Sequence, residues 1–214
     1  MNSNANPLSR PLLRRFAPSL IKGTIVAALS GFALAACSPQ PVAEAEPPLA
    51  GATIGGPFTL TSSTGETVRW ADFRGKYAIV YFGFTFCPDI CPTDMQRLAQ
   101  GLKILEERNP DLVANIQPVF ISVDPERDTP AKVGEFAAAF SDDLMGLTGT
   151  PEQVAAAADA FAVYYSRGED TAGGYLVDHT NIVYFFDPDG NPLSMLPTDQ
   201  GADAVAAEIE KWAN

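Results

Sequence analysis

The sequence predicts an α/β sandwich, in which helices flank a central mixed β-sheet. Two nearly continuous apolar runs, 76–84 (KYAIVYFGF) and 116–123 (IQPVFISV), are typical of strands buried on both faces of a mainly parallel sheet. A threonine followed by a proline, the usual start signal of a helix, occurs at Thr129-Pro130 and again at Thr150-Pro151. Strands and helices therefore alternate along the chain.

The first half of the domain also contains a predicted N-terminal hairpin. Residues 57–70 (PFTLTSSTGETVRW) form two short polar-apolar segments around a turn at Thr64-Gly65. After the first buried strand, leucines and a methionine recur at helical spacing, which predicts a helix at about 92–107. The next helix is expected from 130 to about 140, and a short strand at 144–147.

The second half is predicted to end with an antiparallel strand pair. A helix is expected from 151 to about 164, and an apolar strand at 181–186 (NIVYFF). The turn residues of 187–190 (DPDG) reverse the chain into a strand at 190–196. A helix over 202–212 completes the fold. This late hairpin is what makes the predicted sheet mixed.

Residues 1–36 are predicted to be a signal peptide or a membrane anchor. The only charged side chains among them are four basic ones, and the 14 residues of 23–36 are small or apolar. That run is short for a bilayer span, which needs about 20 residues, and suits a signal peptide. It ends in LAAC, which resembles the bacterial lipobox, so Cys37 is the expected lipidation site. The alternative is an uncleaved anchoring helix over 16–36.

Both alternatives predict an exported domain on a membrane tether. Residues 37–50 are rich in Pro, Ala and Glu and are expected to be a disordered tether, followed by the folded domain at 51–214. After residue 36 the chain carries 10 Lys and Arg against 26 Asp and Glu, a net charge of −16. Such a domain repels nucleic acid and anionic lipid. We expect it in the periplasm of the bacterial cell envelope.

The segment FGFTFCPDICPTD (82–94) contains the most informative residues, Cys87 and Cys91. Pro88 disfavours a helical Cys87 and keeps it at the extended end of its strand. Pro92 suits the first position of a helix, so Cys91 is expected at or near the N-cap, where a helix terminus lowers a thiol pKa. Both sulfurs then lie at the carboxyl edge of the sheet, where ligand sites are common.

The CxxxC spacing leaves three uses of these cysteines open: a structural disulfide, a redox dithiol and a metal clamp. Residues one helical turn apart have Cβ atoms about 5–6 Å apart, whereas a disulfide needs about 3.5–4.5 Å. Two thiolates that share a metal tolerate a wider separation. The spacing therefore favours a metal modestly, while the oxidising compartment favours a disulfide.

His179, the only histidine, precedes the predicted strand at 181–186. A lone histidine is more commonly a surface or hydrogen-bonded residue than a ligand. If its strand lies near the first buried strand, however, the imidazole approaches the two cysteines. Two thiolates and an imidazole form a soft ligand set that suits Cu(I), with zinc as an alternative. Asp178 could orient the imidazole, although capping a turn is its more ordinary role.

Three segments together resemble the Sco/SenC family of copper proteins: FGFTFCPDICPTD (82–94), SVDPERDTP (122–130) and YLVDHTNIVYFFDPDG (175–190). The resemblance extends over roughly 52–213. We interpret Asp124, Arg127 and Asp128 of the second segment mainly as loop and cap structure. One departure is Phe86, because many relatives have a histidine just before the first cysteine.

The resemblance implies a thioredoxin-like fold related to the peroxiredoxins. It also implies copper binding, as Cu(I) or Cu(II), by Cys87, Cys91 and His179, with a Cys87–Cys91 disulfide when oxidised. The implied function is that of a metallochaperone, not a conventional enzyme, that helps to assemble the dinuclear copper centre of cytochrome c oxidase subunit II. Further candidate partners are other periplasmic copper carriers and a thiol reductant. Two alternatives stay open: a thiol–disulfide reductase that keeps the cysteines of the oxidase copper site reduced, and a redox or copper sensor.

Overall fold

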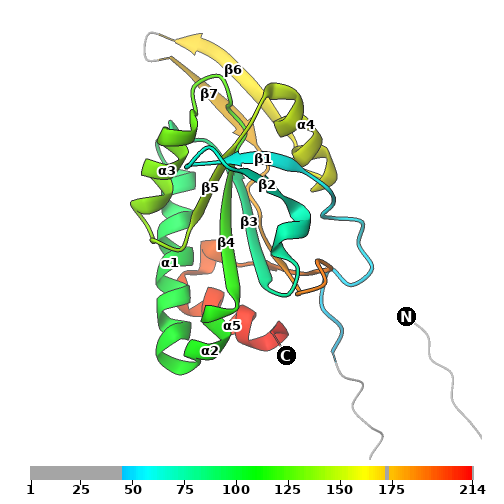
Figure 1. Ribbon diagram of the computed structural model, residues 1–214. Helices are drawn as coiled ribbons and strands as arrows, with labels where there is room; N and C mark the ends of the chain where they lie inside the picture. Colours follow the sequence, from blue (N-terminus) through cyan, green and yellow to red (C-terminus); the bar gives the residue numbers. More distant parts are fainter. Residues whose placement is uncertain (1–44, 172–173, 214) are drawn as a thin grey trace, which may run out of the picture. The chain divides into compact units, whose positions relative to one another are not determined.

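A computed structural model describes residues 45–171 and 174–213 (Figure 1). The predicted targeting segment at 1–36, the lipidation site Cys37 and most of the tether at 37–50 lie outside the described residues. No helix in the described part of the chain has the length and apolarity needed to cross a membrane.

The core of the domain is a seven-stranded mixed sheet with the order β2-β1-β5-β4-β3-β8-β9. The pairs β3–β4 and β4–β5 are parallel, and the other four pairs of this sheet are antiparallel. The strands are β1 (Thr59–Ser62), β2 (Thr67–Arg69), β3 (Tyr77–Gly83), β4 (Ile116–Ser122), β5 (Met145–Thr148), β8 (Val183–Phe186) and β9 (Pro192–Leu196). The predicted mixed α/β sandwich is confirmed.

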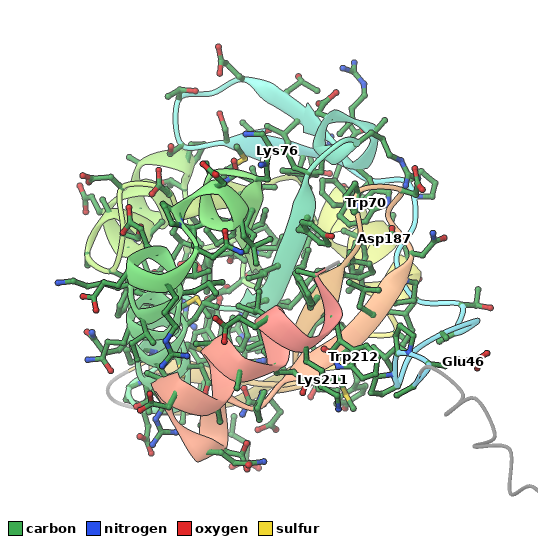
Figure 2. All side chains as sticks on the ribbon, turned by 90° about the horizontal axis from the view of Figure 1, so that it is seen from below. Glu46, Trp70, Lys76, Asp187, Lys211 and Trp212 are labelled. Carbon is green, nitrogen blue, oxygen red and sulfur yellow. The ribbon has the colours of Figure 1, made fainter. Side chains whose placement is uncertain are left out.

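Helices cover both faces of this sheet. The α-helices are α1 (Ile90–Arg108), α2 (Pro110–Ala114), α3 (Pro130–Ala138), α4 (Pro151–Ala160) and α5 (Ala202–Trp212). Short 3₁₀ turns lie at Trp70–Phe73 and Thr198–Gln200. Helix α5, red in Figure 1 and in the foreground of Figure 2, packs against α1. Gly101 of α1 makes this close contact, because an added Cβ there would lie 2.7 Å from the side chain of Val205.

The side chains of β3 alternate between the two faces, and both are buried. Tyr81 points toward α1, where its hydroxyl meets Asp94, while Phe82 points to the opposite face and packs on Phe161. Such two-sided burial explains the continuous apolar run in the sequence. The carboxyl end of β3 therefore emerges from a rigid core directly beside the first turn of α1.

The predicted helix starts at Thr129 and Thr150 are present. The Thr129 hydroxyl accepts a hydrogen bond from the backbone of Lys132, and the Thr150 hydroxyl accepts one from Gln153. Proline follows each threonine as the first helical residue. Helix α4 ends at Ala160 rather than at about 164.

A second sheet, which the sequence analysis did not predict, projects from the domain. Strands β6 (Tyr165–Thr171) and β7 (Gly174–His179) form an antiparallel hairpin that pairs with no described strand of the main sheet (Figure 1). The register places Tyr165 opposite His179. The histidine that was expected in a leading loop is therefore the last residue of a strand.

Candidate metal centre

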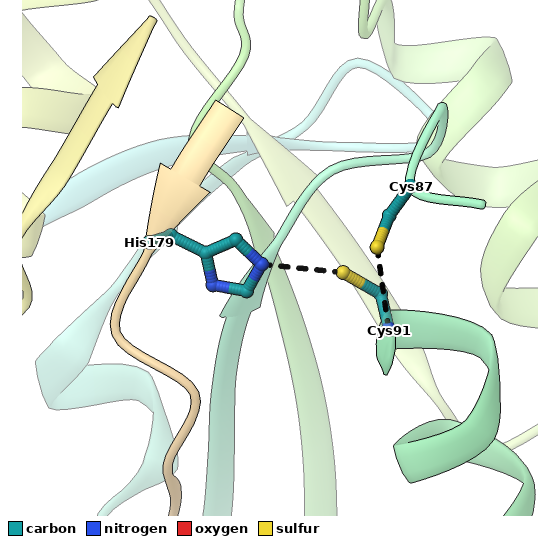
Figure 3. Close-up of side chains that lie close together, drawn as sticks. All are labelled: Cys87, Cys91 and His179. Carbon is teal, nitrogen blue, oxygen red and sulfur yellow. Dashed lines mark hydrogen bonds between the residues drawn. The ribbon is translucent and has the colours of Figure 1, made fainter. Parts of the chain in front are cut away.

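The structure brings together Cys87, Cys91 and His179 (Figure 3). Cys87 lies in the loop after β3, Cys91 in the first turn of α1, and His179 at the end of β7. Their two sulfurs and one imidazole nitrogen all lie within 4.8 Å of one another. The structure thus places next to one another the three side chains that the sequence analysis singled out as ligands.

Asp128 holds the loop that leads to Cys87. This carboxylate is fully buried and accepts hydrogen bonds from the Thr85 amide at 2.9 Å and the Thr85 hydroxyl at 2.6 Å. The hydroxyl of Ser122, at the end of β4, donates a third at 2.6 Å. Hydrogen bonds to a charged acceptor are stronger than neutral ones. The loop is therefore attached to the neighbouring strand just before the first cysteine.

The two cysteines are free thiols with different environments. Cys91 is completely buried, whereas Cys87 is half-buried and its sulfur accepts a hydrogen bond from the Cys91 amide at 3.4 Å. Helix α1 starts at Ile90 after the N-cap Asp89, so Cys91 lies in the first turn, near the N-cap as expected. The expected lowering of its pKa is wrong. Burial raises the pKa of the Cys91 thiol, and the hydrogen bond to Cys87 raises it further, while the backbone of Phe84 opposes the shift only in part.

His179 is oriented with its Nε2 toward the cysteines. Nδ1 lies 3.0 Å from the carbonyl oxygen of Thr180, which only accepts, so Nδ1 carries the proton and donates it. The lone pair of Nε2 then faces the sulfur of Cys91 at 3.4 Å. The rings of Tyr81 and Phe84 meet the imidazole edge-on at 6.1 and 5.9 Å between centroids. Burial lowers the pKa of His179, which keeps the ring neutral.

Asp124, Arg127 and Tyr175 form a clamp between the segment 122–130 and β7. The Arg127 guanidinium pairs with Asp124, donates to the Tyr175 carbonyl at 2.8 Å, and lies 3.6 Å from the Tyr175 ring centroid. The Tyr175 hydroxyl donates to Asp124 at 2.7 Å. Asp124 and Arg127 therefore do more than shape their loop, because they also hold the strand that ends at His179.

Phe86, the residue that departs from the family pattern, lies over this clamp. Its ring centroid is 4.7 Å from the Arg127 guanidinium and 4.6 Å from the Lys132 ammonium, and the side chain is 47% exposed. Asp178 is exposed and does not orient the imidazole, which donates to Thr180 instead. Asp178 and His179 are consecutive residues of β7, and consecutive residues of a strand face opposite sides.

Sequence reasoning missed a buried polar group beneath the cysteines. Asp94 is 1% exposed and accepts a hydrogen bond from the Tyr81 hydroxyl at 3.3 Å. The same hydroxyl lies 3.0 Å from the side-chain oxygen of Asn181. The position of Asp94, three residues after Cys91 in a helix, was a signal that both face the same side.

Comparison with known proteins identifies a family. The family model SCO1/SenC matches residues 46–214. The protein SCO1 homolog 1, mitochondrial, of Arabidopsis thaliana is 42% identical over 177 residues, which are 80% of this chain and 52% of that protein. The chain thus spans about half the length of this curated relative.

Solved structures share the fold. The crystal structure of Arabidopsis thaliana ScoI with copper bound has a TM-score of 0.71 and 39% identity, and covers 75% of this chain and 98% of its own. A structure of BsSco, described as having a disulfide switch and as a member of the Sco family of cytochrome c oxidase assembly proteins, has a TM-score of 0.55 and 26% identity, and covers 77% and 96%. The thioredoxin-like fold implied by the sequence resemblance is confirmed.

Proposed function

Because the chain belongs to the SCO1/SenC family, we propose that it is a copper metallochaperone that serves cytochrome c oxidase assembly. Copper is its cargo, held by the sulfurs of Cys87 and Cys91 and by Nε2 of His179. The acceptor is the dinuclear copper centre of subunit II. The single observation that carries the proposal is the convergence of these three donor atoms within 4.8 Å.

The donor geometry fits a three-coordinate soft metal. Bonds of about 2.0 Å to nitrogen and about 2.3 Å to sulfur, spread evenly in a plane, would place donors about 3.7–4.0 Å apart. The Cys91 sulfur and His179 Nε2 are 3.4 Å apart, so small side-chain movements suffice. The Thr180 carbonyl preselects the imidazole tautomer that offers Nε2, as outer hydrogen bonds do for metal-bound histidines. Soft thiolates favour copper over harder ions.

The environment of the cysteines also favours release by ligand exchange. Cys87 is half-buried in a loop, whereas Cys91 is buried at the base of the site. An acceptor thiolate can therefore approach from the side of Cys87 while Cys91 and His179 still hold the ion. Release then proceeds by stepwise replacement, without a free ion in solution.

A thiol–disulfide reductase is the second candidate, and the asymmetry of the two thiols favours it. An accessible cysteine can attack a disulfide, after which a buried neighbour resolves the mixed disulfide. Cys87 and Cys91 have this arrangement, and the relative BsSco is described as having a disulfide switch. In this function His179 is not needed as a ligand.

We further propose that the domain is anchored in the bacterial cell envelope and faces the periplasm, through a segment at 1–36 or through lipidated Cys37. The support is sequence composition alone.

A transfer experiment separates the two functions. The reduced, Cu(I)-loaded chain is mixed with the copper-free soluble domain of subunit II, whose cysteines are prepared either reduced or as a disulfide. A metallochaperone delivers copper to the reduced acceptor, and His179→Ala abolishes delivery. A reductase acts on the oxidised acceptor, and His179→Ala leaves its rate largely unchanged. Thr93→Ala, a change in the same first turn of α1 at a side chain that is not a ligand, is the control for both. Failure of the wild type to deliver copper would overturn the metallochaperone.

A further inference from the structure

Asp94 is an unusual group to find next to the cluster of two cysteines and a histidine. Its side chain is 1% exposed, in α1, on the helix face of Cys91. Among the described residues, no basic nitrogen forms an ion pair with it. Its recorded hydrogen bond comes from the neutral Tyr81 hydroxyl at 3.3 Å. Carboxylates are rarely this buried without a cationic partner, because desolvation is costly.

Asp94 is close enough to influence the cluster without belonging to it. It is not part of the group of donor atoms that lie within 4.8 Å of one another. Burial lowers the pKa of His179, and the negative charge of Asp94 is among the influences that oppose this shift. Tyr81 connects the two, since its hydroxyl meets Asp94 and its ring meets the imidazole. The Asp94 carboxylate therefore adds a negative contribution to the potential at the cluster before any thiolate forms.

We propose that Asp94 is a specificity-determining residue that shifts the site toward Cu(II) relative to Cu(I). The inference rests on the proposed copper function. A fixed negative charge attracts a divalent cation twice as strongly as a monovalent one at the same position. Asp94 is shielded from solvent, so its effect is not screened as that of a surface carboxylate is. The bound copper ion thus supplies the positive charge that no basic side chain of the described residues provides to Asp94.

The test compares the isosteric variant Asp94→Asn with the wild-type chain. Cu(I) affinity is measured by anaerobic chelator competition, Cu(II) affinity by competition with a divalent chelator, and the Cu(II)/Cu(I) midpoint potential by potentiometric titration. We expect the factor lost for Cu(II) to be about the square of that lost for Cu(I). If Cu(I) binding weakens about tenfold, Cu(II) binding weakens about a hundredfold, and the potential rises by about 59 mV.

Asp89→Asn is the matched control. Asp89 lies in the same CPDICP segment but is exposed, so removal of its charge should change either affinity less than about twofold, and less still in 1 M salt. The Asp94 effect should persist in 1 M salt. Thermal unfolding of the metal-free variants verifies folding, and Asp94→Ser is a second neutral variant if asparagine is not tolerated there.

The outcomes distinguish this inference from the function on which it rests. Equal losses of Cu(I) and Cu(II) affinity, or an unchanged potential, would show that Asp94 acts only through structure, and would overturn the inference while leaving the metallochaperone intact. If the wild type binds neither ion tightly, both the role of Asp94 and the metallochaperone function are overturned.

Discussion

At the scale of single residues, the two cysteines differ in ways that decide their chemistry. Cys91 is completely buried and its pKa is raised by burial, whereas Cys87 is half-buried at the mouth of the cluster. The thiolate is the reactive form, and access limits its reaction. Cys87 is therefore the first point of contact for a partner.

We expect iodoacetamide to alkylate Cys87 at least about tenfold faster than Cys91 in the reduced, metal-free chain, because both access and ionisation are reduced at Cys91. Mass spectrometry of the digested protein at successive times measures both rates. Equal rates would mean that Cys91 is much less enclosed than its environment in the structure indicates.

Copper binding should strengthen with pH. The pKa of Cys91 is raised, so the thiol is protonated near neutral pH and must release a proton when it binds the ion. The pKa of His179 is lowered, so its nitrogen is already free at that pH. The Cys91 proton alone makes the apparent affinity rise about tenfold per pH unit between pH 6 and 8. Chelator competition at three pH values measures this slope, and a flat profile would contradict it.

At the scale of elements, the position of His179 depends on the hairpin β6–β7. The hairpin pairs with no described strand of the main sheet, and the clamp of Asp124, Arg127 and Tyr175 attaches it. Tyr175 lies four residues before the histidine in the same strand. Loss of a clamp contact should therefore loosen His179 without touching the ligand.

Tyr175→Phe removes the hydroxyl that donates to Asp124 and retains the ring over Arg127. The loss of one such charged hydrogen bond should lower the free energy that holds the hairpin in place by about 1.5–3 kcal/mol. Faster amide hydrogen exchange in residues 174–179, with little change in the main sheet, is the expected result. Tyr164→Phe, at a side chain that is 67% exposed, is the matched control. Unchanged hydrogen exchange in the Tyr175 variant would show that the clamp does not hold the hairpin in place.

Some elements could be predicted from sequence and others could not, for local reasons. Strands β3 and β4 are buried on both faces, so their sequences are continuous apolar runs. Helices α3 and α4 each begin with a threonine N-cap followed by a proline. Strand β6 (YSRGEDT) is polar and contains a glycine, so it lacks a strand pattern. In β7, the alternation of Tyr175, Val177 and His179 toward one side was the available signal.

At the scale of the whole molecule, the site lies at the carboxyl end of β3 beside α1, and an aromatic core lies on the face of the sheet opposite α1. Phe161 is fully buried there and contacts the rings of Phe58, Trp70, Phe82 and Phe186. Interlocking rings of this kind make the sheet a stable base for the loops that present the site.

Phe161→Ala should reduce the free energy of unfolding by about 3–5 kcal/mol, because it leaves a cavity among these rings. Urea denaturation of the reduced, metal-free chain measures the change. Met195→Ala, at a side chain that is 47% exposed, should cost about 1 kcal/mol or less. Similar costs for the two variants would contradict the assignment of the core.

The site as a whole could be anticipated only in part. The residues that carry soft donors stood out because cysteine and histidine are scarce in the chain. Cys91 and His179 are 88 positions apart in the sequence, and their approach depended on sheet order, which local patterns do not determine. The buried Asp94 and the role of Tyr81 escaped detection because a helix face and a strand face meet there only in the folded domain.

The most direct measurement is the Cu(I) affinity of the reduced chain by anaerobic chelator competition, with the wild type and His179→Ala compared side by side. We expect tight one-to-one binding that weakens by orders of magnitude when the imidazole is removed, while Thr93→Ala retains wild-type affinity. Weak binding by the wild type, or the same affinity without His179, would contradict a three-ligand copper site and favour the dithiol reductase.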